Sequence, residues 1–297
     1  MPSSKVGDCG VDCPPNELFS VLMPLYFKEN PEHLKSSLRS VIEQTVAPRE
    51  IVLVREYDLP EELQKEVDDF LSANGPVEIR ICHNPELKGR GLGAVLAYGI
   101  EQCRFPLIAR MDSDDISLPD RFERQLAVFD RFPETAVVSG TIAEFANDPE
   151  TVTCFRSLPE TPDEIVRFAR YRSPFNQPAV MFRKQAVISV GNYNNSLKRC
   201  EDYDLWFRLL LAGYQGRNVK EPLVLYRSSG MVQRRADEAH MGAYDALRKR
   251  MYAAGFVNFV QCYGSIALHR MLQGMSGGMQ QRFYQHFLRV RNGGEEA

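Results

Sequence analysis

The sequence predicts an α/β protein in which a mainly parallel, twisted sheet is flanked by helices and followed by a helical C-terminal extension. Short apolar runs alternate with amphipathic helical patterns from residue 19 to about residue 145, as in parallel sheets covered by helices on both faces. Beyond residue 145 the alternation weakens, and from about residue 235 the pattern is helical throughout. With 297 residues, 44% of them hydrophobic and 25% charged, the chain can bury one large core or two small ones.

The first half contains a regular series of strands and helices. Residues 19–23 form a short apolar run of the kind found in buried strands. A helix is expected to begin at Pro31, because Asn30 suits the N-cap and proline suits the first helical position. Further strands are expected over residues 51–54, 77–82, 107–109 and 136–138, with helices beginning at Pro60, Gly93 and Pro119.

The second half is less regular. The pattern predicts a loop-rich stretch over 146–176 with a short helix near 165–171, a strand over 179–182, a helix over 203–212 and a strand over 223–226. The chain is therefore expected to comprise a loose arm (1–17), a main domain (18–232) with halves 18–145 and 146–232, and a C-terminal helical segment (233–297).

Charge is distributed unevenly along the chain. The net charge of −3 excludes binding to nucleic acid by overall charge, so no nucleic-acid partner is expected. Residues 227–297 nevertheless hold ten Lys or Arg and only five Asp or Glu. In this segment Arg227, Arg234 and Arg235 would suit phosphate oxygens, and a solvated face is the alternative.

The cysteines and the N-terminal residues indicate where in the cell the protein is expected to be. The seven cysteines are odd in number and scattered, and Cys82 and Cys103 lie in apolar patterns typical of a core. The N-terminus lacks the apolar centre of a signal peptide, which together with the cysteines predicts a reducing, cytoplasmic location. No run of about 18 apolar residues exists, so no membrane-spanning helix is expected.

A cluster of acids directly follows the predicted strand 107–109. Asp112, Asp114 and Asp115 place three carboxylates within four residues at the carboxyl end of a strand, where α/β sheets bind ligands. These carboxylates repel one another unless a cation lies between them, and a divalent cation with substrate phosphates would meet that need. A solvated turn that caps the following helix is the alternative.

A second acidic cluster begins the predicted helix near residue 203. Glu201, Asp202 and Asp204 suit the positive end of a helix dipole, so capping is one explanation. Three acids in one turn exceed what a cap requires, however. The other explanation is a general base that removes the proton from an attacking hydroxyl.

A third segment, residues 84–93, combines glycines and cations ahead of a helix. Lys88, Arg90, Gly91 and Gly93 suit an anion such as a diphosphate at the helix N-terminus. The spacing matches neither the P-loop nor the dinucleotide fingerprint, and a flexible turn is the alternative.

Taken in order, these segments resemble the family 2 glycosyltransferases, inverting nucleotide-sugar enzymes with the Rossmann-like GT-A fold. The resemblance covers residues 19–235 and rests on Ser20–Tyr26, Ser40–Thr45, Asp112–Asp115, Leu118–Phe122 and Glu201–Trp206. The ordered set is far more specific than any single motif. The tail resembles a subgroup linked to bacterial capsule, exopolysaccharide and lipopolysaccharide assembly.

The resemblance implies a role for each motif. Residues 18–145 would form the nucleotide-sugar half and residues 146–232 the acceptor half. Asp114, with Asp112, would bind a divalent metal, Mn²⁺ or Mg²⁺. Asp202 would deprotonate the acceptor hydroxyl, and Glu201 would orient the acceptor or the base. The residues expected around the nucleotide are Pro24, Tyr26, Glu56, Arg90 and Asp112.

The chain departs from the family pattern at two positions. The second strand of the family usually ends in two aspartates, one of which contacts the uracil ring, whereas this chain has Glu56 and Asp58. Glu56 keeps the carboxylate on a longer arm, so a UDP-linked hexose remains the expected donor. Gln177 stands where related sequences often have histidine before proline, and it can form hydrogen bonds but cannot titrate.

The C-terminal segment allows two interpretations. Its apolar and aromatic residues alternate with arginines, which suits the surface of an anionic bilayer and a glycan or lipid-linked acceptor. On this interpretation the protein is peripheral on the inner face of the plasma membrane. The alternative is a helical cap packed on the sheet domain.

Two other functions fit parts of the pattern. One is a phosphatase or phosphotransferase with Asp112 as nucleophile and Asp114 as acid, although such enzymes would be expected to place this pair after the first strand. The other is a non-catalytic sugar-nucleotide binder or assembly partner, which would have no need of Asp202.

Overall fold

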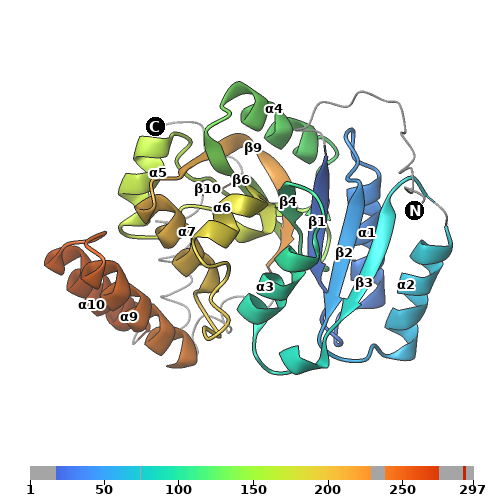
Figure 1. The fold of residues 1–297 in the computed structure, drawn as a ribbon, viewed down its shortest axis with the longest axis horizontal. Helices are drawn as coiled ribbons and strands as arrows, with labels where there is room; N and C mark the ends of the chain where they lie inside the picture. The colour runs from blue at the N-terminus through green and yellow to red at the C-terminus, as the bar shows by residue number, and fades with distance from the viewer. Residues whose placement is uncertain (1–17, 74, 229–237, 274–289, 292–297) are drawn as a thin grey trace, which may run out of the picture.

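The computed structural model describes residues 18–73, 75–228, 238–273 and 290–291. It confirms the α/β fold: one twisted sheet carries helices on both faces, and a pair of C-terminal helices packs at one end (Figure 1). The sheet order is β10-β7-β6-β8-β4-β1-β2-β3, and β9 pairs with both β6 and the short β5.

The first half is parallel, as expected. Its strands are β1 (Phe19–Pro24), β2 (Glu50–Arg55), β3 (Glu78–His83) and β4 (Leu107–Arg110). Its helices are α1 (Pro31–Ile42), α2 (Glu61–Ser72) and α3 (Leu92–Gln102). The side chain of Asn30 accepts a hydrogen bond of 2.9 Å from the amide of Glu32, which confirms the predicted cap.

The second half is mixed, an arrangement that the weaker pattern beyond residue 145 did not predict. Its strands are β5 (Ile116–Ser117), β6 (Thr135–Phe145), β7 (Val152–Arg156), β8 (Met181–Arg183) and β9 (Gln215–Arg227). β8 runs antiparallel between β4 and β6, and β7 runs antiparallel to β6, whereas β6 and β9 are parallel. Only a short loop joins β6 to β7, and such a loop can connect only antiparallel neighbours.

Several elements differ in extent from the prediction. The segment expected to be loop-rich contains β7, and α5 (Pro162–Ala169) begins three residues before the predicted helix because Thr161 and Glu164 form a capping box. A 3₁₀ turn (Gln177–Ala179) precedes β8 and α6 (Lys184–Ser189) follows it. The remaining helices of the main body are α4 (Arg121–Arg131) and α7 (Glu201–Leu211).

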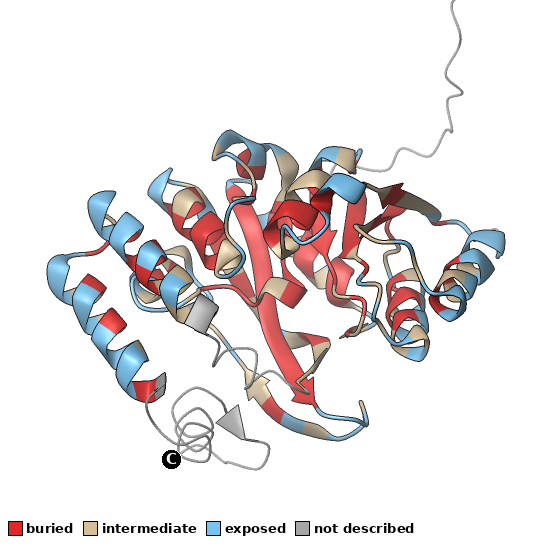
Figure 2. Ribbon diagram, turned by 90° about the horizontal axis from the view of Figure 1, so that it is seen from below, coloured by how far each residue is buried: buried red, intermediate tan, exposed pale blue. Residues whose placement is uncertain are grey.

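Each face of the sheet has its own apolar core. One core packs α1, α2 and α4 against the sheet through residues such as Leu38, Val67 and Phe122. The other packs α3, α5, α6 and α7 through residues such as Ile100 and Trp206. Figure 2 shows the sheet buried between exposed outer helix faces. Cys82 and Cys103 are buried in the second core, as their apolar surroundings predict.

The C-terminal segment contains α9 (Glu238–Ala253) and α10 (Phe259–Gln273). It is not helical throughout, because β10 (Val290–Arg291) pairs antiparallel with β7. Leu247, Met251 and Ile266 pack on Tyr203 and Phe207 of α7, so the hairpin does cap the main body. Among the helices described, none has the length and apolar character that crossing a bilayer requires. The N-terminal arm, Arg234 and Arg235 lie outside the described residues.

Candidate active site

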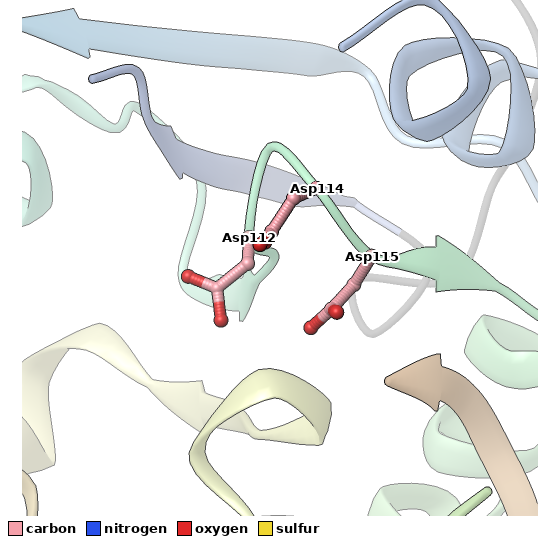
Figure 3. A group of neighbouring side chains, drawn as sticks. All are labelled: Asp112, Asp114 and Asp115. Carbon is pink, nitrogen blue, oxygen red and sulfur yellow. The ribbon is translucent and has the colours of Figure 1, made fainter. Parts of the chain in front are cut away.

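The acidic cluster lies in the loop between β4 and β5. Oxygen atoms of Asp112, Asp114 and Asp115 all lie within 4.8 Å of one another, and Figure 3 shows all three side chains projecting from this one loop. Asp115 is fully buried, and its Oδ1 accepts a 2.8 Å hydrogen bond from the amide of Arg227. Its Oδ2 is buried without a hydrogen-bond partner among the described residues.

The electrostatics of this cluster favour a cation. Burial, followed by repulsion from Asp112 and Glu29, raises the pKa of Asp114 to about 7. Burial, followed by repulsion from Asp112 and Asp114, raises the pKa of Asp115 well above its usual range. Carboxylate oxygens are the ligands that Mg²⁺ and Mn²⁺ prefer. The orphaned oxygen and the mutual repulsion therefore fit a divalent cation.

Surrounding elements hold the loop in shape. Arg110, at the end of β4, forms a buried ion pair with Asp112. The Nε atom of Arg227 donates to the carbonyl oxygen of Asp114 at 3.1 Å, and Ser113 Oγ donates to Glu29 at 2.9 Å. Arg227, the last residue of β9, was predicted to suit phosphate oxygens. In the structure it contacts the loop that carries Asp114 and Asp115.

The second acidic motif occupies the first turn of α7. Cys200 precedes it with a φ of 60°, in the left-handed region, and Glu201 and Asp202 are half-buried. Burial, followed by repulsion from Asp202, raises the pKa of Glu201 to about 7, while Arg110 acts to lower it. Arg110 thus pairs with Asp112 of the first motif and acts electrostatically on Glu201 of the second, so it lies near both.

The glycine-containing segment lies against this helix. Gly91, with a φ of 93°, is the N-cap of α3. A Cβ atom at Gly93 would lie 3.0 Å from Cβ of Glu201, so the two segments are in contact. Glu56, which follows β2, accepts a hydrogen bond of 3.2 Å from the amide of Gly89, and burial raises its pKa. Arg90 is exposed on the same segment.

The other predicted nucleotide contacts lie at the end of β1. Pro24 ends the strand and is half-buried, and Tyr26 is 50% exposed. The ring of Phe27 lies between Tyr26 and Tyr57, with centroid separations of 4.8 and 4.6 Å. Since Tyr57 follows Glu56 directly, these predicted residues lie along the carboxyl ends of β1 and β2.

The sequence analysis missed three residues near the site. Arg110 could have been noticed, because a cation two residues before Asp112 at the same strand end is a local signal. Glu29 and Tyr193 carry no such signal. Glu29 reaches the loop through Ser113, and Tyr193 is brought there from beyond α6.

Comparison with protein families agrees with this geometry. The family model described as "Glycosyl transferase family 2" matches residues 20–198. The amylovoran biosynthesis glycosyltransferase AmsE of Erwinia amylovora is 38% identical over 219 residues, covering 73% of this chain and 79% of that protein. The UDP-Gal:alpha-D-GlcNAc-diphosphoundecaprenol beta-1,3-galactosyltransferase of Escherichia coli is 32% identical, covering 81% and 86%.

Solved structures share the fold at low identity. S. aureus TarS 1–349 in complex with UDP has a TM-score of 0.60 at 14% identity, covering 90% of this chain and 74% of that one. The mannosyltransferase PcManGT of Pyrobaculum calidifontis, in complex with GDP-Man and Mn²⁺, has a TM-score of 0.59 at 13% identity, covering 89% and 72%. The motif order, the GT-A fold and the family match agree, and the chain belongs to glycosyl transferase family 2 and is a glycosyltransferase.

Proposed function

We propose that the protein transfers a hexose-type sugar from a UDP-sugar to a hydroxyl of a glycan or lipid-linked acceptor during the synthesis of a bacterial surface polysaccharide. The reaction depends on a divalent metal and inverts the anomeric centre. The observation that carries this proposal is that Arg110 pairs with Asp112 of the first acidic motif and acts on Glu201 of the second, so the two motifs lie near the same side chain. Relatives named for amylovoran synthesis and for a UDP-Gal donor support the substrate class.

The donor side is formed by the ends of β1, β2 and β4. Asp114 and Asp112, with Asp115 beside them, would hold Mn²⁺ or Mg²⁺, which supplies charge stabilisation for the departing nucleoside diphosphate. Pro24, Tyr26 and Glu56 bind and orient the nucleotide, with Asp112 at the ribose. Arg90, exposed on the glycine-containing segment, meets diphosphate oxygens.

The acceptor side is formed by the first turn of α7. Asp202 takes the proton of the attacking hydroxyl, and Glu201 orients the acceptor or the base. The hydroxyl oxygen attacks the anomeric carbon on the face opposite the leaving diphosphate. The bond to the acceptor forms as the bond to the diphosphate breaks, so a single displacement inverts the centre without a covalent enzyme intermediate.

This function replaces the alternatives left open by the sequence. Membership of the glycosyltransferase family favours glycosyl transfer over a phosphatase with Asp112 as nucleophile. The presence of Asp202 in the first turn of α7 favours an enzyme over a non-catalytic sugar-nucleotide binder.

The outer face of α10 suits a peripheral, cytoplasmic position on the inner face of the plasma membrane. Most of its exposed positions are uncharged, and the exception is Arg270, which pairs with Asp245 of α9. The uncharged exposed positions are Phe259, Val260, Tyr263, Gly264, Ala267, Leu268 and Met271. Phe259 is 61% exposed and Val260 is 75% exposed, so the capping contact with α7 leaves this face uncovered by the described residues. Flotation with anionic liposomes at low salt tests this position, and failure to bind would contradict it.

The decisive experiment separates donor binding from transfer. Thermal shifts with UDP-sugars, GDP-mannose and free diphosphates are measured with Mn²⁺, with Mg²⁺ and with EDTA. A ligand at about 100 times its dissociation constant adds about 2.7 kcal/mol of stability, which such a shift detects. A metal-dependent shift with one UDP-sugar is expected. The absence of a shift with every nucleotide sugar would overturn the proposal.

The Asp202→Asn variant completes the test. We expect it to bind the UDP-sugar as tightly as the wild type and to lose transfer, since only the base is removed. Asp69→Asn, an exposed acid on α2, is the matched control and should keep both. Retention of transfer by Asp202→Asn would show that another group is the base.

A further inference from the structure

The first helix, α1, bonds through its side chains to the acidic loop, residues 111–115 between β4 and β5. Ser37 and Ser40 lie three residues apart on α1, and Gln44 lies in the turn just after it. Ser37 and Gln44 are buried, and Ser40 is half-buried. Ser40 and Gln44 belong to the Ser40–Thr45 motif, to which the proposed mechanism assigns no role. Buried polar side chains need partners, and all three find them at the acidic loop or at its exit.

The two serines hold the two ends of the acidic loop. Ser37 Oγ donates to the carbonyl oxygen of Asp112 at 2.9 Å. Ser40 Oγ accepts from the amide of Ser117, in β5, at 3.0 Å and donates to the carbonyl oxygen of Ser37 at 2.7 Å. The serines are therefore linked to each other as well as to the loop, and they fix its start and its end against one helix.

Gln44 holds the segment that leaves β5 and begins α4. Its Nε2 atom donates to the carbonyl oxygens of Leu118 at 2.7 Å and of Ser40 at 2.8 Å. Its Oε1 atom accepts from the amide of Phe122 at 3.3 Å. The side-chain amide thus uses its donors and its acceptor on main-chain atoms alone. A glutamate in its place would have no donor for the two carbonyl groups.

These bonds restrain the loop and leave its carboxylates free. Each contact ends on a carbonyl oxygen or an amide group of the main chain, and none uses a carboxylate oxygen. Oxygen atoms of Asp112, Asp114 and Asp115 lie within 4.8 Å of one another and repel, so an unrestrained loop would spread them apart. Restraint through the main chain holds these oxygens together without occupying them. A cation site needs this arrangement, in which the ligands are held in place before the ion binds.

We infer that Ser37, Ser40 and Gln44 are positioning residues for the divalent cation: they hold the acidic loop in the shape in which its carboxylates bind the metal. This inference rests on the proposed function, because it requires a cation at Asp112 and Asp114. It gives the motif at the end of α1 a part in metal affinity, exerted through the loop and not by contact with the ion.

The test measures metal affinity directly, in the full chain. Titration calorimetry with Mn²⁺ and with Mg²⁺ is performed with UDP or GDP at saturation, whichever the wild type binds more tightly. We expect the dissociation constant for Mn²⁺ to rise by roughly 3- to 10-fold in Ser37→Ala, which loses one bond to the loop. In Gln44→Met, which loses the bonds to Leu118, Ser40 and Phe122, it should rise by about 10-fold or more.

Two further readouts distinguish a positioning role from a general loss of stability. Affinity for the same nucleoside diphosphate in EDTA should change by less than about 2-fold in both variants, since the ends of β1 and β2 are untouched. At saturating Mn²⁺ the kcat of Ser37→Ala should return to within about 2-fold of the wild type, whereas the Mn²⁺ concentration that gives half the maximal rate should remain raised.

Two other serines supply matched controls. Ser36 is the exposed neighbour on α1, and its Oγ donates to the carbonyl oxygen of Glu32 within the helix at 2.8 Å. Ser36→Ala should leave both the Mn²⁺ affinity and the Tm close to those of the wild type. Ser139 is a fully buried serine of β6 that donates to the carbonyl oxygen of Asn176 at 3.0 Å. Ser139→Ala should lower the Tm, as Ser37→Ala does, and should leave the Mn²⁺ affinity unchanged.

The outcomes separate this inference from the function on which it rests. If the wild type binds neither Mn²⁺ nor Mg²⁺ with either nucleotide, the metal dependence of the proposed function is overturned and the inference falls with it. If the wild type binds the ion and Ser37→Ala binds it equally well, only the inference is overturned. A lower Tm in Ser37→Ala with the Mn²⁺ affinity of Ser139→Ala would show that the bond to Asp112 serves the fold alone. Should Gln44→Met fail to fold, Ser37→Ala decides the question, because it removes a single hydroxyl group.

Discussion

The donor side and the acceptor side of the site are held in different ways. Asp112, Asp114 and Asp115 follow β4 directly, so the parallel sheet carries them to its edge. Glu201 and Asp202 begin α7, and α7 is held in position by α9, which lies more than 40 residues later in the chain. Arg250 of α9 pairs with the buried Asp204 at 2.5 Å. The comparison teaches that the geometry of the proposed donor site depends on the local sheet, whereas the position of the proposed base depends on the C-terminal hairpin.

The largest effect is expected from a substitution that changes only the proposed donor side. Asp114→Asn removes a carboxylate from the proposed metal site, so the metal-dependent part of the nucleotide-sugar thermal shift should disappear. Transfer should fall by about 10²-fold or more, the size of losing one charge-stabilising group. Asp120→Asn, a half-exposed acid paired with Arg124 beyond the same loop, is the control and should keep both properties. A metal-dependent shift that survives in Asp114→Asn would contradict the site.

A smaller effect is expected from loosening the acceptor side. Arg250→Ala removes one of the two arginines paired with Asp204, while Arg208 remains at 2.8 Å. We expect kcat to fall by roughly 3- to 10-fold, because a small displacement of α7 misplaces the base. Calorimetry should show unchanged affinity for the nucleotide sugar. Lys249→Ala, an exposed neighbour on α9, is the control. An equal loss of donor affinity would show that the two sides are not separable.

The raised pKa of Glu201 predicts a pH dependence of stability on the acceptor side. Since the folded-state pKa of about 7 exceeds the ordinary value of 4.5, ionisation of Glu201 destabilises the fold, and stability is lost as pH rises from about 4.5 to about 7. Glu201→Gln cannot ionise, so it should be more stable than the wild type at pH 8 by about 1–3 kcal/mol. The difference should vanish near pH 4, as measured by denaturant unfolding. A difference that does not depend on pH would refute this assignment.

The smallest effect on the enzyme itself is expected at the outer face of α10. The double substitution Phe259→Ser and Val260→Ser replaces two exposed side chains, so the Tm and transfer to a soluble acceptor should change little. Flotation with anionic liposomes should nevertheless fall severalfold, because each removed side chain contributed apolar area to the bilayer. Unchanged flotation would assign binding to another surface.

The sequence predicted what local pattern determines. Asn30 and Pro31 identify the start of α1, and the apolar run ahead of Asp112 places the acidic loop at a strand end. Strand direction is not a local property, so the strand at β8 was predicted but its antiparallel direction could not be. The full length of β6 was missed for a related reason, since its 11 buried residues include Thr135, Ser139 and Glu144, which look like surface positions.

The residues of the candidate site likewise fall into those that the local sequence predicts and those that only the fold brings together. The motif residues were predicted because each carries its chemistry in a short run of sequence. The contact between Gly93 and Glu201 was not predicted, because only the fold brings together two segments that are more than 100 residues apart. Glu29 and Arg227 were missed as loop supports for the same physical reason: their partners lie more than 80 residues away.

The packing of α9 and α10 on α7 sets a lower limit on the length of a working enzyme. The matched family region ends at residue 198, three residues before Glu201. A fragment cut there would lack the proposed base. One cut at residue 228 would keep it but expose Tyr203 and Phe207 and leave Asp204 without Arg250. Protein engineers who exchange acceptor specificity between relatives should therefore move α7 and the hairpin together, as one cassette.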